Sequence, residues 1–133
     1  MIINGLYCEY KKLYRYVEIC RALIHKPVST FKHFAILVDK SRIISIGFND
    51  ISRPTDLVKF PLGGRHAEPD AIANLDDLNI IRKCNLISIR LNPRGELRLA
   101  KPCDICHTFL VKMGIKKIYY STEFGFNYMD LRS

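Results

Sequence analysis

The chain has 133 residues, of which 48% are hydrophobic and 26% charged, a composition typical of a globular protein with room for one domain and no second one. Its longest apolar runs, Phe34–Val38 and Leu86–Ile89, are far shorter than the roughly 18 residues of a bilayer span, so we expect no membrane-spanning segment. The first residues lack the pattern of a secretory signal, and we expect a cytoplasmic protein.

The charge and the cysteine content narrow the possible partners and chemistry. The sequence has 21 lysines and arginines against 13 aspartates and glutamates, so its net charge is +8. This excess favours polyanions or anionic small molecules as partners, although a positive surface can also serve solubility alone. Five cysteines are an odd number for a disulfide framework, and in a cytoplasmic chain they indicate metal ligation, redox chemistry or buried thiols.

The first half of the chain predicts a helix followed by a hairpin. Apolar residues recur every three or four positions over residues 6–24, with charged residues between them, which is typical of an amphipathic helix. Phe34–Val38 and Ile43–Phe48 predict two strands, and the tight turn over residues 39–42 joins them as an antiparallel hairpin. Residues 49–65 carry prolines and glycines without sustained periodicity, so we expect a long loop that borders the functional site.

The second half alternates helices and strands. The expected elements are a helix from about His66 with apolar spacing to Leu78, a strand over 86–91, a short extension over 96–100, a helix from about Cys103 to Met113, and strands over 117–121 and 126–131. Only about four residues separate the last two strands, so they are expected to pair as an antiparallel hairpin. This order predicts a single α/β domain over residues 1–133, with helices packed on a sheet.

Two short motifs can carry chemistry. His66-Ala67-Glu68 opens the second expected helix, and Pro102–Cys106, with the pattern P-C-x-x-C, opens the third. At such positions the backbone N–H groups and the helix dipole favour thiolates and lower their pKa. The imidazole of His66 and the thiolates of Cys103 and Cys106 would supply three ligands to Zn²⁺, leaving the fourth tetrahedral position for water, as in catalytic zinc sites.

Glu68 completes the predicted chemistry. Zinc lowers the pKa of a bound water toward ~7, so that hydroxide is available at neutral pH. Glu68 lies two residues from His66, near enough to take the water proton and pass it to a ring nitrogen and then to a leaving amine, without binding the metal. The pattern H-x-E followed by P-C-x-x-C is the signature of zinc-dependent nucleobase deaminases.

From about Leu6 to Leu131 the chain resembles the cytidine deaminase superfamily. The resemblance rests on the two motifs, with weaker agreement over residues 47–49 and 114–121. It implies a mixed five-stranded sheet with helices packed on both faces and with the last two strands antiparallel. It also implies that Asn49 contacts the sugar or base of the substrate, that the backbone of Ala67 helps to bind the base edge, and that the protein can form a homo-oligomer.

The substrate stays open at this stage. His66 stands where free cytidine deaminases generally have Cys, and Asp50 replaces the last residue of the Gly-x-Asn-Gly pattern usual in deoxycytidylate deaminases. Adenine-specific members need a purine pocket, which a sequence does not reveal. We predict a zinc-dependent hydrolase that converts cytosine to uracil in a free (deoxy)cytidine nucleoside or nucleotide, with cytosine in single-stranded DNA or RNA as the alternative.

A polynucleotide substrate requires contacts beyond the base. Three basic residues in the loop before the second helix are candidates for phosphate contacts: Arg53, Lys59 and Arg65. Tyr120 and Phe124, at a strand end and in the terminal hairpin, are candidates for contact with a neighbouring nucleotide.

Other interpretations of these residues explain less. Cys103–His107 matches the C-x-x-C-H motif of c-type haem attachment, which leaves His66 and Glu68 without a role. A structural zinc needs a fourth protein ligand, and a binding module could keep zinc without turnover. We interpret the remaining thiols, Cys8, Cys20 and Cys84, as buried small hydrophobic residues. The N-terminal tyrosines Tyr7, Tyr10 and Tyr14 are expected in the core or at its edge. His25 and His33 are expected to be ordinary residues beside a turn.

Overall fold

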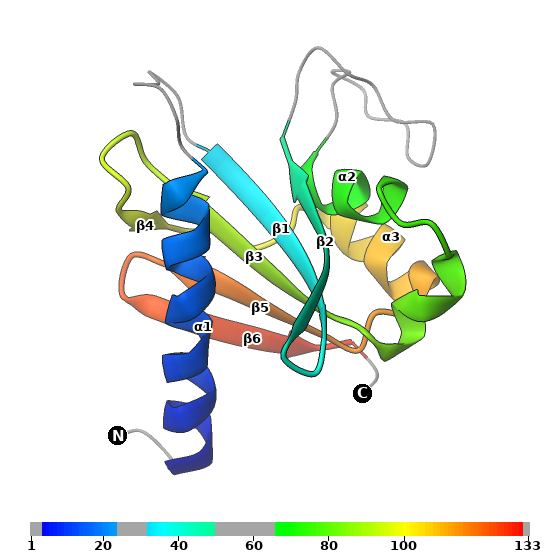
Figure 1. Ribbon diagram of the computed structural model, residues 1–133, viewed down its shortest axis with the longest axis horizontal. Helices are drawn as coiled ribbons and strands as arrows, with labels where there is room; N and C mark the ends of the chain where they lie inside the picture. Colours follow the sequence, from blue (N-terminus) through cyan, green and yellow to red (C-terminus); the bar gives the residue numbers. More distant parts are fainter. Residues whose placement is uncertain (1–3, 24–31, 50–65, 132–133) are drawn as a thin grey trace.

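One mixed sheet with helices on both of its faces organises the fold (Figure 1). The computed structural model describes residues 4–23, 32–49 and 66–131, with side chains from residue 11 onward. The elements in chain order are α1 (Asn4–Ala22), β1 (Lys32–Asp39), β2 (Arg42–Phe48), α2 (Ala67–Ala73), the 3₁₀ helix η1 (Leu78–Lys83), β3 (Asn85–Leu91), β4 (Leu97–Arg98), α3 (Asp104–Met113), β5 (Lys117–Thr122) and β6 (Gly125–Asp130).

The strands form a five-stranded path in the order β2-β1-β3-β5-β6, and the two-residue β4 pairs with β3 beside this path. β1 is antiparallel to both β2 and β3, whereas β3 and β5 are parallel. The connection between these parallel strands runs through β4 and α3, which places α3 on one face of the sheet. β5 and β6 pair antiparallel, as the short segment between them predicts.

α1 covers one face of the sheet with residues at the predicted helical spacing. Leu13, Tyr16, Val17 and Cys20 are buried in one cluster with inward-facing residues of β1, β3 and β5. Tyr14, expected at the core or its edge, is 45% exposed and meets the ring of Phe126 edge-on, with 5.5 Å between ring centroids. Among the helices of the described ranges, none has the length and apolar character needed to cross a membrane.

α2 and α3 cover the opposite face. Residues that alternate with those of the α1 face, such as Ala35, Leu37 and Leu86, pack with Ile72 of α2 and Leu110 of α3. The central strands β1 and β3 are therefore buried on both faces, which explains why their sequences are continuous apolar runs. Cys84 belongs to this second core and Cys20 to the first, so the interpretation of these two thiols as buried residues is confirmed. The side chains of Cys8, Tyr7, Tyr10 and His25 lie outside the described part of the chain.

A glycine lets α2 lie directly on β2. A Cβ atom at Gly47 would stand 2.2 Å from the backbone nitrogen of Ala71 and 2.3 Å from the carbonyl oxygen of Ala67, far inside van der Waals contact. Side chains add hydrogen bonds between the two elements: Ser45 Oγ donates to the Ala71 carbonyl over 2.6 Å, and the Phe48 N–H donates to Asp70 Oδ2 over 2.8 Å. These contacts fix where α2 begins, and with it the position of His66.

The helix expected from His66 to Leu78 is shorter than its apolar spacing indicates. α2 ends at Ala73, and η1 begins at Leu78, whose side chain is 48% exposed. Asp77 starts this new element because its carboxylate accepts a hydrogen bond from the Asn79 N–H over 2.9 Å. Asn74 ends α2, and its Nδ2 donates to the Ile46 carbonyl over 3.1 Å. Local side-chain bonds therefore override the periodicity.

Candidate active site

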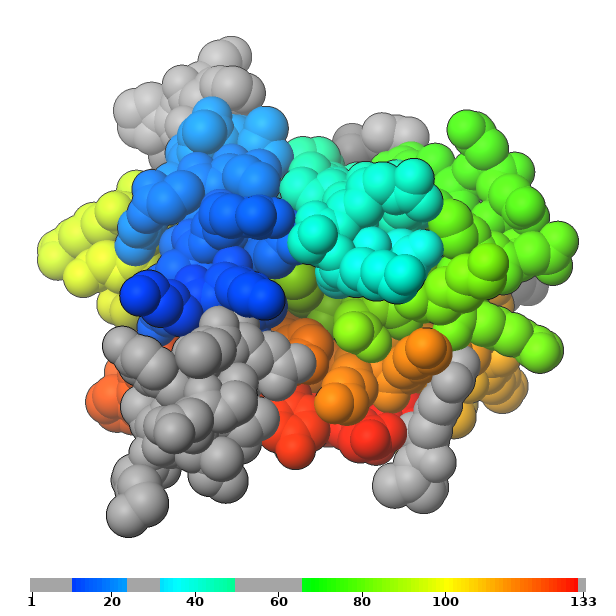
Figure 2. All heavy atoms as spheres, turned by 60° about the horizontal axis from the view of Figure 1, so that its bottom comes forward, coloured from blue at the N-terminus to red at the C-terminus, as the bar shows by residue number. Residues whose placement is uncertain are grey.

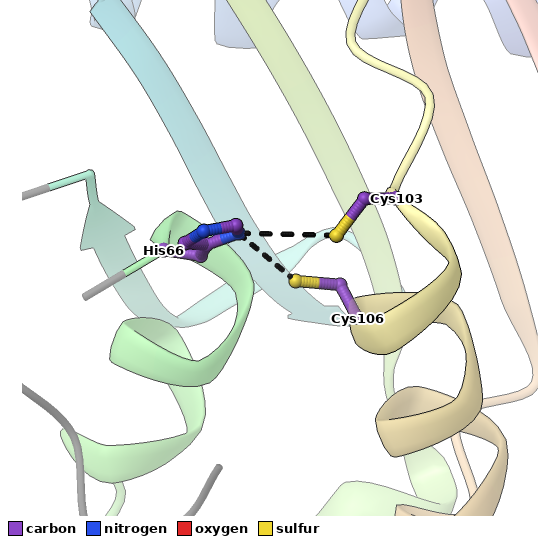
Figure 3. Close-up of side chains that lie close together, drawn as sticks. All are labelled: His66, Cys103 and Cys106. Carbon is purple, nitrogen blue, oxygen red and sulfur yellow. Dashed lines mark hydrogen bonds between the residues drawn. The ribbon is translucent and has the colours of Figure 1, made fainter. Parts of the chain in front are cut away.

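α2 and α3 begin beside one another, and the residue just before each helix belongs to the site (Figure 3). His66 and Cys103 are the N-cap residues, with extended ψ angles of 158° and 167°, so that their side chains leave the backbone where the chain turns into a helix. Cys106 lies in the first turn of α3 and is fully buried. The sequence predicted both helix starts within one residue.

The three predicted metal ligands lie together. Nδ1 of His66 is 3.4 Å from Sγ of Cys106 and 4.0 Å from Sγ of Cys103, and all three ligand atoms lie within 4.8 Å of one another (Figure 3). Zinc–nitrogen and zinc–sulfur bonds of about 2.05 and 2.3 Å at tetrahedral angles set nitrogen and sulfur about 3.6 Å apart. The cluster therefore fits Zn²⁺ in both its ligand types and its spacing.

Ser121 positions the segment that leads into α3. Its buried Oγ donates to the Arg98 carbonyl over 2.7 Å and accepts from the Arg90 N–H over 3.0 Å, while its carbonyl accepts from the Ala100 N–H over 2.9 Å. The end of β5 thus holds the segment from β4 toward Cys103. Sequence analysis did not single out Ser121, because a serine at a strand end carries no distinctive signal.

Glu68 is buried beside the cluster. Only 1% of its surface is exposed, and its Oε1 has no hydrogen-bond partner among the described residues. Burial, followed by the nearby Glu68 and Cys103, raises the pKa of the Cys106 thiol well above its usual range. A dication between these groups would reverse that effect, because it favours thiolate. A buried carboxylate oxygen without a partner beside a metal-ligand cluster is suited to exchange protons with a molecule bound there.

A cavity of about 180 Å³ opens beside these groups. This volume is below the roughly 300 Å³ of the smaller drug-sized pockets. The cavity is lined by His66, Glu68 and Cys103 together with residues from β1, β3 and the segment before α3: His33, Arg90, Leu99, Ala100 and Lys101.

His33 is the residue of this lining whose place the sequence analysis missed. We expected an ordinary histidine beside a turn, but His33 lies in β1 and its Nε2 is 2.6 Å from the hydroxyl of the buried Ser88. Burial lowers the pKa of His33, with Arg90 and His66 adding to this effect and Glu68 opposing it. The available signal was strand alternation, which places His33 on the same face as Ala35.

The other residues predicted to contact the substrate do not lie together in the structure. Asn49 is exposed at the end of β2, where its N–H and its Oδ1 bond to the backbone of His33. Ala67 is fully buried under β2. Tyr120 is 8% exposed and packs in the core below α2 and α3, whereas Phe124 is 96% exposed in the β5–β6 turn. The three basic loop candidates fall within residues 50–65, outside the described ranges.

Known proteins resemble this chain in sequence family and in fold. The family described as the cytidine and deoxycytidylate deaminase zinc-binding region matches residues 10–122. A cytidine deaminase from Burkholderia pseudomallei aligns with 15% identity and a TM-score of 0.53 over 88% of each chain. The dCMP deaminase of cyanophage S-TIM5, in complex with dCMP and dUMP, aligns with 22% identity and a TM-score of 0.51 over 84% of this chain and 80% of its own. No curated protein matches the chain.

The apo form of the cyanophage enzyme aligns with 23% identity and a TM-score of 0.44, over 66% of this chain and 64% of its own length. At these identities the solved structures establish the likeness of fold only. The match over residues 10–122 covers most of the chain, and it includes all three residues of the metal-ligand cluster.

Proposed function

We propose that this chain, which belongs to the cytidine and deoxycytidylate deaminase family, is a zinc-dependent hydrolase that replaces the amino group of a cytosine base with a carbonyl oxygen and releases ammonia. His66, Cys103 and Cys106 hold the metal, and Glu68 moves protons. The observation that carries this proposal is the juxtaposition of the three ligand atoms with the buried, unpartnered Oε1 of Glu68.

The chain's residues divide the chemistry between them. Zinc, when bound, would acidify a water molecule and so make a nucleophile available at neutral pH. Glu68 accepts a proton from the attacking water and delivers it to the ring nitrogen next to the reacting carbon. It then takes the remaining proton from the new hydroxyl group on that carbon and supplies it to the departing amino group. The cavity holds the base against Glu68, and a base bound there would displace water from it. Water and cytosine are consumed, and uracil and ammonia are formed.

The proposed substrate is a free (deoxy)cytidine nucleoside or nucleotide. The cavity of about 180 Å³ has room for a single nucleobase beside Glu68. The cyanophage relative holds dCMP and dUMP, which supports a nucleotide of the same kind here. Arg90 and Lys101, which line the cavity, place positive charge where the phosphate of a nucleotide would reach.

The test is ammonia release from deoxycytidine, deoxycytidylate and a cytosine-containing single-stranded oligonucleotide, measured in parallel on zinc-loaded protein. We expect turnover of at least one of the two free substrates. Glu68→Gln, which keeps the volume and removes the charge, is the matched control and should be inactive. Protein with a full complement of zinc that deaminates none of the three substrates would contradict the proposal.

Cytosine in single-stranded DNA or RNA is the alternative substrate, favoured by the net charge of +8 and by the exposed ring of Phe124. Each phosphate that the protein neutralises on a single strand would add roughly −0.7 to the slope of log affinity against log salt. We expect that replacing Arg53, Lys59 and Arg65 together by alanine would then reduce oligonucleotide binding and leave deoxycytidine turnover unchanged. Absence of oligonucleotide binding at low salt would remove this alternative.

We also propose that the protein is cytoplasmic and forms a homo-oligomer. Sedimentation of the zinc-loaded protein over a range of concentrations would test the homo-oligomer, since a monomer at every concentration would contradict it.

A further inference from the structure

A groove of about 570 Å³ lies on the α1 face of the sheet, away from the metal-ligand cluster. Its apolar lining comes from the buried core of that face, with two residues of α1 and three of the strands: Leu13, Tyr16, Val38, Ile87 and Tyr119. The rest of the lining is polar: Lys12, Arg15, Lys40, Ser41 and Asn85. The volume lies within the range of hollows that take up ligands, so the groove can receive side chains of another molecule.

The lining of the groove holds three cations and, among the described residues, no acid. Lys12, Arg15 and Lys40 are exposed, and none of them pairs with a carboxylate in the part of the chain that the structure describes. The Arg15 guanidinium lies 5.4 Å from the centre of the Tyr16 ring, and its Nη2 donates to the Ser41 carbonyl over 3.4 Å. These contacts hold the charge of Arg15 beside the groove, which therefore attracts negatively charged groups.

Asn85 adds a buried acceptor to the groove. Its Oδ1 is buried and has no hydrogen-bond partner among the described residues. Asn85 pairs with Val38 across β3 and β1, and it lies on the same face as Ile87, two residues further along β3. A buried oxygen without a donor costs free energy, which an N–H group of an occupant would recover. The groove thus suits an occupant that combines negative charge, an apolar side chain and an N–H donor.

The segment that leads into η1 has these three properties. Asp76, Asp77, Leu78 and Asn79 are all exposed, Leu78 to 48%. Neither aspartate forms an ion pair within the described ranges. The side-chain amide of Asn79 can donate to an acceptor oxygen. We call residues 76–79 the acidic tip.

The acidic tip and the groove lie at the same end of the sheet but on opposite faces. Ile81 of η1 packs in the core under α2 and α3, whereas the groove lies on the α1 face. η1 ends at Lys83, and β3 begins two residues later with Asn85. Figure 2 shows this end, with α1 in blue, the β1–β2 turn in cyan and the segment from α2 to η1 in green beside it. The tip is therefore on the far side of the sheet from its own groove and is available to the groove of another chain.

We propose that the groove is an interface with a second copy of this chain, whose acidic tip enters it. Leu78 of that copy packs on the apolar lining, its two aspartates lie against the three cations, and its Asn79 amide donates to Oδ1 of Asn85. Because groove and tip lie at one end of the sheet, a two-fold axis can place each tip in the other groove and close the dimer. The inference rests on the proposed homo-oligomer and does not depend on the deamination chemistry.

Reversing the charge on either side tests this interface. Lys12→Glu with Lys40→Glu changes the groove, and Asp76→Lys with Asp77→Asn changes the tip, where the asparagine keeps the N-cap of η1. Lys11→Glu with Arg42→Glu is the matched control, because these exposed residues carry the same charges beside the groove without lining it. By sedimentation at low salt, we expect the dimer dissociation constant to rise more than tenfold in the groove and tip variants and less than threefold in the control.

Mixing the two variants gives a second readout. In a mixed dimer the negative groove meets the positive tip, and the unchanged groove meets the unchanged tip, so association should return to within about threefold of the wild type. Each variant is first checked for wild-type circular dichroism and zinc content. A monomeric wild type would overturn the inference, as would an unchanged dissociation constant in the groove variant, an equal loss in the control, or no recovery on mixing.

The same preparations separate this inference from the proposed function. A wild-type dimer that responds as expected but deaminates none of the three substrates would contradict the proposed function and leave the interface standing. An active oligomer whose dissociation constant is the same in the wild type and in both variants would overturn the interface alone.

Discussion

The two faces of the sheet are built from the same strands but differ in chemistry. On the α1 face, the buried cluster consists of aliphatic and aromatic side chains together with Cys20. Burial raises the pKa of that thiol to about 12, which keeps it protonated and unreactive at neutral pH. Six polar side chains are buried among the described residues. Four of them lie on the opposite face, namely Ser45, Glu68, Asp70 and Ser88, and the other two, Asn92 and Ser121, lie at the ends of β3 and β5.

Of two hollows in the described part of the chain, the larger does not lie on the face with the proposed catalytic groups. A groove of about 570 Å³ is lined by α1 residues Lys12 and Arg15, by Lys40 of the β1–β2 turn, and by neighbouring strand residues. Figure 2 shows α1 in blue beside this turn in cyan, with β5 and β6 in orange to red below. The cavity at the metal-ligand cluster has about a third of that volume. Chemistry, and not volume, therefore identifies the site.

The comparison teaches how one sheet can serve stability and catalysis together. Polar groups on the α2 and α3 face either bond to the backbone, as Ser45 and Asp70 do, or are directed at the site, as Glu68 is. Burial of Oε1 of Glu68 without a partner among the described residues costs folding free energy. The apolar clusters on the two faces of the sheet offset that cost.

The largest effect is expected from removing the thiolates. Replacing Cys103 and Cys106 together by serine should abolish both zinc binding and deamination, because one imidazole cannot hold the ion at the affinity of a three-ligand site. Metal analysis of freshly purified protein is the measurement, with Cys20→Ser, on the α1 face, as the control that keeps its zinc. Unchanged zinc in the double variant would show that the metal is held elsewhere.

The next effect concerns the close approach of α2 to β2. Gly47→Ala would place a methyl group 2.2 Å from a backbone atom of α2, so the helix must move. We expect a loss of about 3 kcal/mol in the free energy of unfolding and a fall in turnover by the folded protein, since His66 and Glu68 move with α2. Urea unfolding with an activity assay measures both, and a Gly47→Ala variant of wild-type activity would show that α2 adjusts without moving the site.

A pair of leucines sharpens the contrast between the faces. Leu13 of α1 and Leu110 of α3 are both buried, and truncating either to alanine should cost about 2 to 5 kcal/mol of stability. Turnover by the folded fraction should stay normal in Leu13→Ala and fall in Leu110→Ala, because one proposed metal ligand, Cys106, lies in α3 and another, Cys103, is its N-cap residue. Equal turnover in the two variants, corrected for folded protein, would mean that the faces are not functionally distinct.

The smallest effect is expected at the tip of the β5–β6 turn. Phe124→Ser should change stability by less than about 0.5 kcal/mol, because the ring is 96% exposed. Activity on a free nucleoside should not change either. A loss confined to an oligonucleotide substrate, of the order of the 1 to 3 kcal/mol that base stacking supplies, would favour the polynucleotide alternative.

The sequence predicted the strands, the helix starts and the metal cluster because each has a short-range signal. Alternation and apolar runs locate strands, and H-x-E with P-C-x-x-C places its ligands at helix starts, where two N-cap residues can meet. His33 and Ser121 were missed because their importance comes from contacts made by distant strands, with Ser88 and with the segment before α3. The early end of α2 was missed because capping by Asn74 and Asp77 overrides periodicity.

The measurement that tests the central claim most directly combines zinc content and turnover in one preparation of Glu68→Gln. The account predicts one zinc per chain, as in the wild type, and a fall in turnover of about 10²- to 10⁴-fold, because the carboxylate moves protons and does not bind the metal. Turnover within tenfold of the wild type would contradict the role of Glu68, and loss of zinc would contradict its separation from the ligands His66, Cys103 and Cys106.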